Sequence, residues 1–299
     1  MIQDSQFIVN KLASVIGDVI WTARYVWQGK HINFRMQIDL EDPFDQRFES
    51  RSFALELTVA LRQLLRRDDL VVDAGAQKGY VTLHAASLVG RNGKVFSFEP
   101  DSRSRAVLLE NCRLNRVTNV FISDMALGDT SGIRQIKLSS QLGWSSFYPN
   151  ARNKHTTVSE EAVVVEKMDD VLAKELGVHR FNLIKFVKID CEGSELEVLR
   201  GMQTLSSTAA PIIWVEVNTG SLDAAESSEG ELLNLLTQYG FRTYLPKVEL
   251  NIFGIPCLTM AAYYGNAEDH SHRVFDVVAV KDDHLGQLRF FGIHVLCKE

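Results

Sequence analysis

From residue 70 onward, short apolar runs alternate with amphipathic segments, and no other feature limits the possible folds of this chain so strongly. Strands separated by helix-length segments pair in parallel, and a parallel sheet is covered by helices. The pattern therefore predicts an α/β fold with a doubly wound, mostly parallel sheet of seven strands. The expected strands are 70–75, 94–100, 119–124, 183–190, 211–217, 241–245 and 274–280.

The overall charge and the cysteine distribution narrow the class of protein. A formal charge of -6 argues against nucleic-acid binding, which depends on clustered Lys and Arg, and favours a small-molecule acceptor. The four cysteines are dispersed, with no metal-ligand spacing. No apolar run reaches the roughly 18 residues that a transmembrane segment needs. We therefore expect a cytoplasmic protein without a transmembrane segment.

A long N-terminal segment precedes the alternating strands and helices, and two stretches interrupt them. This segment is residues 1–60, and apolar residues at helical spacing there predict a helical cap: Ile8, Leu12, Val15, Ile16, Val19 and Ile20. Residues 61–299 then form the main domain. Two polar or irregular stretches, 128–165 and 247–273, are expected to be insertions near the acceptor site, although residues 133–138 look like an extra strand.

The first glycine turn, Asp73-Ala-Gly75-Ala-Gln-Lys-Gly79, indicates what kind of ligand binds. It lacks the closely spaced Gly-x-Gly of dinucleotide sites and the Lys-Ser/Thr of phosphate loops, which disfavours a phosphate-bearing nucleotide. Asp73 would repel phosphate but can accept hydrogen bonds from an ammonium group. A ligand with an amino-acid end and a nucleoside end suits this turn, and a nicotinamide cofactor is the alternative.

Acidic residues follow the other strands, where ligands bind in open parallel sheets. Glu99 is placed to accept both ribose hydroxyls, and Asp124 to accept from an adenine amine with help from the backbone of Met125 and Ala126. Together with the glycine turn, these carboxylates outline S-adenosylmethionine.

The fourth strand ends in Asp190-Cys-Glu192, which is the best candidate for chemistry. Both carboxylates face one side of an extended chain, so they could hold an acceptor hydroxyl and take its proton, or Asp190 could meet the cofactor's amino end. Lys188 could pair with either. A divalent metal is the less favoured alternative, because no third ligand stands at an obvious spacing.

The residues after Glu192 have a structural explanation. Ser194 and Glu197 form a capping box, in which Ser194 caps the next helix and Glu197 reaches back to it. Glu195 is then a first-turn charge favoured by the helix dipole. Asp190 and Glu192 precede the cap, so capping does not account for them and they remain the catalytic candidates.

These stretches resemble the FkbM family of S-adenosylmethionine-dependent methyltransferases over roughly 53–245. The matching segments are "VVDAGAQKGYVTLHAA", "GKVFSFEPD", "ALGD", "GWSSF" and above all "VKIDCEGSELEVLRG". The resemblance implies a class I methyltransferase (Rossmann-like) fold with an antiparallel last strand. It also implies O-methylation of a hydroxyl on a sugar, glycolipid or polyketide-type metabolite. A homodimer is possible.

The resemblance carries roles onto individual positions. It carries cofactor binding to Asp73, Gly75, Gly79, Glu99 and Asp124. We also expect cofactor contacts at Ala76, Tyr80, Pro100, Met125, Ala126 and Asp190. The catalytic candidates are Asp190, Glu192 and Lys188, and the substrate candidates are Trp144, Ser145, Ser146 and Glu216. Gln77 and Lys78 depart from the family pattern, and we expect Lys78 to point to solvent. The alternatives are a nicotinamide-dependent oxidoreductase and a non-catalytic module that binds S-adenosylmethionine.

Overall fold

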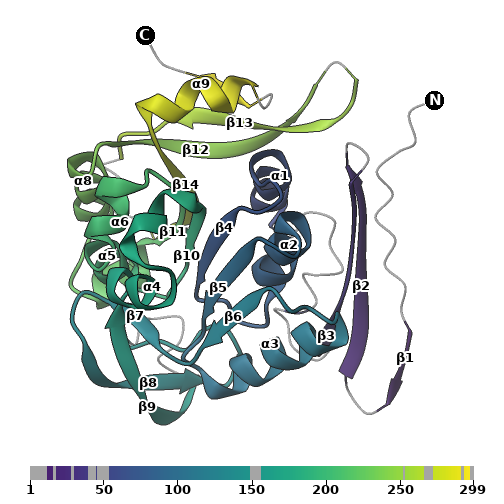
Figure 1. Cartoon of the computed structure of the whole chain (residues 1–299). Helices are drawn as coiled ribbons and strands as arrows, with labels where there is room; N and C mark the ends of the chain where they lie inside the picture. The colour runs from purple at the N-terminus through teal and green to yellow at the C-terminus, as the bar shows by residue number, and fades with distance from the viewer. Residues whose placement is uncertain are drawn as a thin grey trace.

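A computed structural model describes residues 12–15, 18–27, 30–39, 45, 54–148, 156–251, 253–265, 272–290 and 293–296. Its centre is a nine-stranded sheet in the order β15-β13-β12-β14-β11-β10-β4-β5-β6 (Figure 1). The strands in chain order are β4 (Leu70–Ala74), β5 (Lys94–Phe98), β6 (Val120–Ser123), β10 (Ile184–Ile189), β11 (Ile212–Asn218), β12 (Phe241–Leu250), β13 (Pro256–Ala262), β14 (Val274–Lys281) and β15 (His294–Leu296).

The seven expected strands are all present, and their pairing confirms the predicted fold class. β6, β5, β4, β10 and β11 pair in parallel, and β14 inserts antiparallel between β11 and β12. The prediction of an irregular stretch at 247–273 is partly wrong. β12 continues to Leu250 and folds back on β13 as an antiparallel hairpin, to which β15 adds in parallel.

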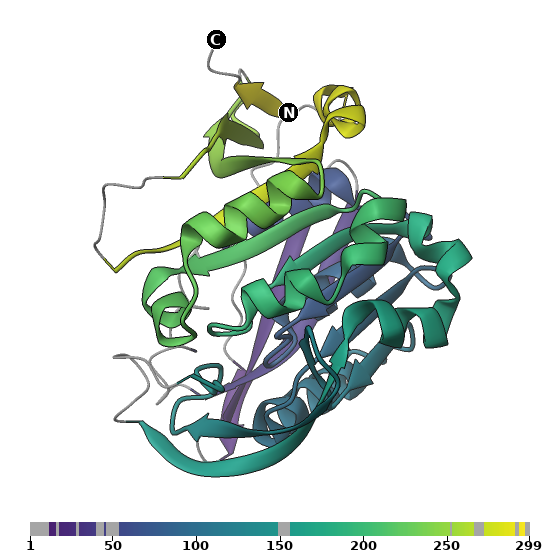
Figure 2. The same ribbon diagram turned by 90° about the vertical axis from the view of Figure 1, so that its left-hand side faces the viewer.

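Helices cover both faces of the sheet, as Figures 1 and 2 show. Alternate residues of a strand point to opposite faces, so Val71 packs in one hydrophobic core and Val72 in the other. The first core includes α1 (Leu55–Leu64), α2 (Tyr80–Val89) and α3 (Ser102–Leu114). The second includes α4 (Met168–Leu176), η2 (Val178–Leu183), α5 (Glu195–Arg200), α6 (Gln203–Thr208), α7 (Thr219–Ala224) and α8 (Glu229–Gln238); α9 (Asp282–Phe290) follows β14. In the described part of the chain, none of these helices is long and apolar enough to cross a membrane.

The predicted N-terminal helical cap is wrong for the residues that the structure describes. They form an antiparallel sheet of β1 (Leu12–Val15), β2 (Asp18–Trp27) and β3 (Lys30–Asp39). Short apolar runs fit helical and strand spacing alike, and the β-branched and aromatic residues of "DVIWTARYVW" favour a strand. Ile8 and Ile16 lie outside the described residues. The domain boundary at residue 60 stays a prediction.

β3 packs against the helices that follow the first two strands of the main sheet. Phe34 and Met36 are buried in the core that α2 and α3 share. The backbone N–H of Gln37 donates to Asn111 Oδ1 at 2.7 Å. Residues far apart in the sequence are thereby fixed side by side, at the right of Figure 1.

The stretch 128–165 is largely a second small sheet. β7 (Ala126–Gly128) pairs in parallel with β9 (Thr157–Lys167), which pairs antiparallel with β8 (Gly132–Ser139). The extra strand expected at 133–138 is confirmed as part of β8. Regular structure resumes at Thr157, inside the stretch that was expected to be an insertion. Figure 2 shows this sheet along the lower edge of the molecule.

Candidate active site

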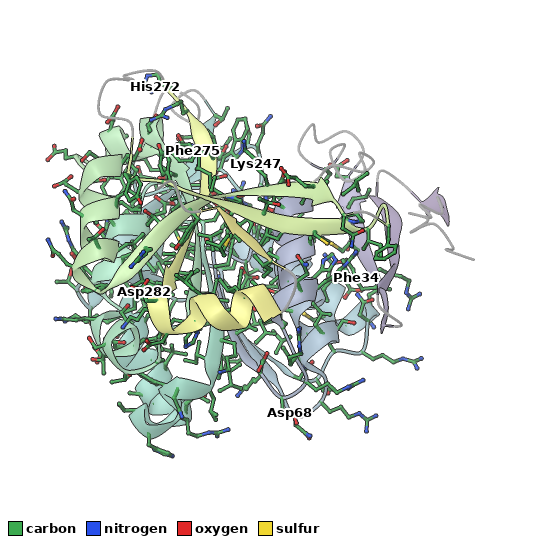
Figure 3. The ribbon with its side chains drawn as sticks, turned by 90° about the horizontal axis from the view of Figure 1, so that it is seen from above. Phe34, Asp68, Lys247, His272, Phe275 and Asp282 are labelled. Carbon is green, nitrogen blue, oxygen red and sulfur yellow. The ribbon has the colours of Figure 1, made fainter. Side chains whose placement is uncertain are left out.

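A cavity of about 560 Å³ opens at the carboxyl ends of the parallel strands. Its walls come from the turn after β4, the ends of β5 and β11, the start of β7, residues 143–147 and the turn after β10. Figure 3 shows His272, which lines the cavity, at one edge of the molecule and Asp68, which precedes β4, at the opposite edge. Ligand binding at this edge is the rule for open α/β sheets.

The glycine turn after β4 is pressed against the end of β10. Gly75 has a φ of +75°, and a Cβ there would lie 1.8 Å from the Asp190 carbonyl oxygen. Lys188 Nζ donates to the Gly75 carbonyl at 2.8 Å. Both Gly75 and Ala76 line the cavity, whereas Gly79, with a φ of +93°, starts α2 behind it. The turn therefore offers backbone rather than side chains to a ligand.

Asp73 lies beneath the cavity and does not line it. Its side chain is fully buried, accepts a hydrogen bond from the Thr82 hydroxyl at 2.6 Å, and has Lys188 Nζ 3.8 Å away. Burial raises the pKa of Asp73 against the lowering effect of Lys188. Burial alone would lower the pKa of Lys188, but Asp190, at 3.2 Å, and Asp73 outweigh it and raise the pKa. Lys188 is thus the cation that joins the glycine turn to Asp190.

Glu99 forms part of the cavity wall, where the sequence predicted it. One carboxylate oxygen accepts from the Gln77 backbone N–H at 2.7 Å, and the other accepts from the Asp101 N–H at 2.9 Å. Burial raises the pKa of Glu99 to about 7 although both amides lower it. Pro100 and Tyr80 line the same cavity, and the Tyr80 hydroxyl shares a hydrogen bond with Thr58.

Asp124 is separated from the other predicted cofactor residues. Its side chain is exposed and is not part of the cavity lining, whereas the neighbouring Met125 and Ala126 are. Since β6 ends at Ser123, the chain turns at Asp124 and directs the next two residues inward. The structure gives no support for the role in adenine binding that we expected of Asp124.

The expectation that Lys78 points to solvent is wrong. Lys78 is 3% exposed, and its ammonium group lies 2.6 Å from the fully buried carboxylate of Asp45. A buried ammonium group needs such a partner. Asp45 also accepts from the Asp39 backbone N–H, so this pair ties the segment after β3 to the glycine turn. Asp45 lies far away in the sequence, where no pattern marked it as the partner of Lys78.

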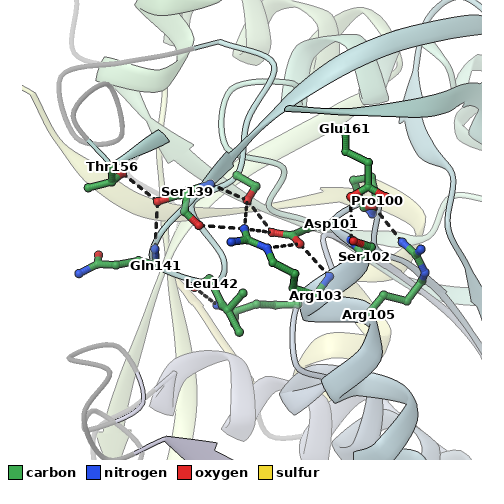
Figure 4. Close-up of polar contacts among 12 residues, drawn as sticks. Pro100, Asp101, Ser102, Arg103, Arg105, Ser139, Gln141, Leu142, Thr156 and Glu161 are labelled. Carbon is green, nitrogen blue, oxygen red and sulfur yellow. Dashed lines mark hydrogen bonds and ion pairs between the residues drawn. The ribbon is translucent and has the colours of Figure 1, made fainter. Parts of the chain in front are cut away.

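The loop that carries Trp144, Ser145 and Ser146 lines the cavity, as predicted substrate residues should. Two contacts hold it: the Ser145 hydroxyl donates to Asp101 at 2.6 Å, and Arg103 contacts the same carboxylate at 2.7 Å. Figure 4 shows Arg103 beside Asp101. Sequence reasoning missed Asp101, because its role as the N-cap of α3 already accounts for an aspartate at this position. Its second role follows only from the position of the loop.

Two further contacts join this loop to both sides of the cavity. The Gln77 side-chain amide donates to the Leu142 carbonyl at 3.1 Å, and the Ser146 hydroxyl donates to the Glu192 carbonyl at 2.6 Å. Gln77 has a φ of +51°, which few residues other than Gly and Asn adopt readily. The loop therefore bridges the glycine turn and the turn after β10.

Glu195 has a larger role than a first-turn charge. It is 1% exposed, and its carboxylate accepts from the backbone N–H groups of Cys191, at 2.8 Å, and Gly193. Burial raises the pKa of Glu195 to about 7 although these amides lower it. Glu192 lies between the two amides with a φ of +50°. Glu195 therefore holds the turn that presents Glu192 to the cavity.

The predicted capping box is wrong. Ser194 stands at the start of α5, but its hydroxyl makes no capping hydrogen bond. Glu197 instead pairs with Arg134 at 2.7 Å and accepts from the Tyr148 hydroxyl. Since Arg134 belongs to β8 and Tyr148 to the loop after it, Glu197 anchors the small sheet to α5.

Glu216 joins Asp190 and Glu192 at the cavity. β10 and β11 are neighbouring parallel strands, so their ends meet, and carboxylate oxygens of the three residues lie within 4.8 Å of one another. Asp276 of β14 pairs directly opposite Glu216. Burial and the carboxylates of Asp190, Glu192 and Asp276 raise the pKa of Glu216 well above its usual range, and burial and Asp190 raise that of Asp276 to about 7.

Two curated relatives match part of the chain. The hexuronic acid methyltransferase AglP of Haloferax volcanii is 32% identical over 157 residues, which cover 51% of this chain and 57% of the relative. Methyltransferase 1 of Beauveria bassiana is 27% identical over 150 residues, or 45% and 59% of the two chains. The chain therefore spans less than two thirds of the length of either relative.

Solved structures that align with the chain are more distant in sequence. The FkbM methyltransferase of Methylobacillus flagellatus aligns with a TM-score of 0.40 and 14% identity over 74% of this chain and 50% of that one. Fibrillarin of Aeropyrum pernix, solved with bound S-adenosylmethionine, aligns with a TM-score of 0.41 and 11% identity over 93% and 100% of the two chains.

The profile described as "Methyltransferase FkbM domain" matches residues 73–243, which is more than half of the chain. The match begins at the carboxylate under the glycine turn and includes the loop at 143–147 and the turn after β10. The resemblance found in the sequence is thus confirmed, and this chain belongs to the FkbM methyltransferase family.

Proposed function

We propose that this protein is an S-adenosylmethionine-dependent O-methyltransferase that acts on a hydroxyl of a small, neutral, polyhydroxylated acceptor such as a sugar. One observation carries the proposal. Asp190 and Glu192, which can accept a hydroxyl proton, line the same cavity as a backbone turn and a wall suited to S-adenosylmethionine. Membership of the FkbM family supports a methyl group as the group transferred, and it weighs against a nicotinamide-dependent oxidoreductase.

The residues at the cavity fit the cofactor. The cavity volume of about 560 Å³ lies within the range of small-molecule sites. Glu99 keeps acceptor capacity beyond its two backbone amides and can receive hydroxyl groups of a ribose. Met125, Ala126 and Phe98 supply an apolar wall for a nucleobase. Gly75 and Ala76 provide a backbone surface near Asp190 for the amino-acid end.

The protein's part in the reaction is positioning and proton transfer. Bound S-adenosylmethionine supplies a methyl group on a sulfonium, which is already activated. An acceptor hydroxyl must approach in line and lose its proton as the new C–O bond forms. The carboxylates of Asp190 and Glu192 are placed to receive that hydrogen bond. Glu195 acts through the turn, because it fixes the backbone on either side of Glu192.

The charge of the cavity bears on the acceptor. Asp190, Glu192 and Glu216 would repel a carboxylate of the acceptor, whereas neutral hydroxyls can donate to them. Trp144 and Phe147 also line the cavity and suit the face of a sugar ring. One curated relative is named for a hexuronic acid; for this chain we propose a neutral ring hydroxyl instead.

Two experiments on the full chain test this proposal. Calorimetry with S-adenosylhomocysteine and NAD should show binding of the first alone. Mass spectrometry of sugar and polyol mixtures incubated with S-adenosylmethionine should then show acceptors that gain one methyl group. Tight binding of NAD alone would refute the assignment.

Variants separate an enzyme from a module that only binds the cofactor. Asp190→Asn and Glu192→Gln should each lower turnover about 100-fold, the usual contribution of a general base. At least one of them should keep the affinity for S-adenosylhomocysteine. Glu175→Gln, an exposed carboxylate on α4, is the matched control and should retain full activity. Undiminished turnover in both site variants would exclude a catalytic role for these residues.

A further inference from the structure

We propose that Asp190, Glu192 and Glu216 bind a divalent cation of the hard, oxygen-preferring kind, such as Mg²⁺, Mn²⁺ or Ca²⁺. The topology brings these residues together. Asp190 and Glu192 follow β10 and Glu216 lies near the end of β11, its parallel neighbour. Sequence reasoning disfavoured a metal for want of a third ligand, and Glu216 is that ligand.

The spacing of the three residues suits one ion. One carboxylate oxygen from each lies within 4.8 Å of the other two. Oxygen atoms bound to the same cation at roughly 2.1–2.4 Å can be at most about 4.2–4.8 Å apart, so the three oxygens fit a shared ligand shell. All three residues line the cavity, which leaves room for waters or an acceptor hydroxyl in the remaining positions.

The negative charge of neighbouring carboxylates favours a cation near the three residues. Asp276 lies opposite Glu216, and the carboxylate of Glu195 is also near. Within the described residues, the Glu216 carboxylate forms no hydrogen bond or ion pair. Lys188 contacts Asp190 from the side of the glycine turn, where it also holds Gly75. An ion between β10 and β11 would offset the repulsion that remains among these carboxylates.

Ser194 supplies an independent indication that a ligand binds here. It is 2% exposed and lines the same cavity two residues after Glu192. Its hydroxyl has no hydrogen-bond partner among the residues that the structure describes. A buried hydroxyl of this kind is unfavourable unless a ligand or water completes it. A hydrated cation would bring such a partner to this wall.

The role of the ion rests on the proposed function, whereas its binding does not. A cation held by these carboxylates would lower the pKa of a coordinated acceptor hydroxyl and orient its oxygen. The direct test is therefore cation binding in the absence of any acceptor.

The experiment measures Mn²⁺ binding to the full chain by electron paramagnetic resonance, with and without S-adenosylhomocysteine. The wild type should bind one Mn²⁺ per chain, and excess Mg²⁺ should displace it. Glu216→Gln should weaken binding by about tenfold or more, as expected when a ligand is lost. Because this variant removes a repelling charge, it should also unfold at a temperature no lower than that of the wild type.

Asp276→Asn is the matched control. It removes a charge of the same sign directly opposite Glu216 without removing one of the three ligands. Mn²⁺ affinity should change by no more than about fivefold, the size of an ordinary charge interaction. Absence of saturable Mn²⁺ binding in the wild type, or wild-type affinity in Glu216→Gln, would overturn the proposal. Cofactor binding and methyl transfer are measured separately, so failure to find an acceptor would count against the proposed function alone.

Discussion

The carboxylates on the two sides of the cavity differ in the partners that surround them. On the side of β4 and β5, each buried carboxylate has partners within the chain: Asp73 has Thr82 and lies near Lys188, and Glu99 has two backbone amides. On the side of β11 and β14, Glu216 and Asp276 face each other in register. The first side is thus stabilised by contacts within the chain, and we propose that a cation completes the second.

The difference follows from how each side is made. A turn that approaches β10 closely, as Gly75 does, places backbone N–H and C=O groups where carboxylates and Lys188 can use them. The antiparallel pairing of β11 with β14 places Asp276 directly opposite Glu216, so two acidic side chains are neighbours there. Like charges directly opposite each other destabilise a sheet. Such a pair is unfavourable unless a ligand of opposite charge offsets the repulsion, as the proposed cation would.

The largest effect should come from Lys188, the cation shared by the two sides. Lys188→Met leaves Asp73 buried without a cation and removes the contact to Asp190. Loss of one partner of a buried ion pair costs about 3–5 kcal/mol, so urea denaturation should show a fall of this size in the free energy of unfolding.

Lys185 provides the control, because it lies on the same strand but is exposed. Lys185→Met should change the free energy of unfolding by less than about 0.5 kcal/mol. A comparably small effect of Lys188→Met would mean that the two sides are stable independently of each other.

A smaller effect should appear in the pH dependence of stability on the cofactor side. The pKa of Glu99 is raised to about 7 in the folded protein, so the folded state binds more protons than the unfolded state above the ordinary pKa of 4.5. Stability present at low pH is therefore lost as the pH rises through 7. Between pH 5 and 8 the loss from one such group is about 2.5 kcal/mol.

Glu99→Gln should remove that share of the pH dependence, measured by urea denaturation of the cofactor-free protein at several pH values. Glu175→Gln should leave the slope unchanged, because Glu175 is exposed. An equal slope in Glu99→Gln and the wild type would show that other buried carboxyls, such as Glu195, account for the pH dependence.

Seven of the nine strands of the main sheet could be predicted from the sequence, because their signals are local. Each parallel strand is a short apolar run, and the carboxylate or glycine after it marks the ligand-binding edge, as Glu99 and Asp190 show. The N-terminal sheet could not be predicted in this way. Its residues satisfy helical spacing as well as strand spacing, and the pairing of β2 with β3 is not visible in that spacing.

The site residues that the sequence missed depend on contacts between distant segments. Glu195 fits the first turn of a helix, and nothing in its neighbourhood shows that its carboxylate turns back to Cys191 and Gly193. Lys78 looked exposed because its partner Asp45 is 33 residues earlier. Glu216 was found, but its closeness to Asp190 follows from the order of the strands, which a single sequence leaves open.

The smallest effect, and one of opposite sign, should come from the acceptor side. Asp276→Asn removes one of two carboxylates that face each other in register, so it should raise the free energy of unfolding at pH 8 by up to about 1 kcal/mol. Burial and Asp190 raise the pKa of Asp276 to about 7, so at pH 5.5 the carboxyl is already protonated and the gain should shrink. Urea denaturation at the two pH values measures the difference, with Glu175→Gln as the control. A variant less stable than the wild type at pH 8 would show that Asp276 is held by favourable contacts, and the contrast between the two sides would then not hold.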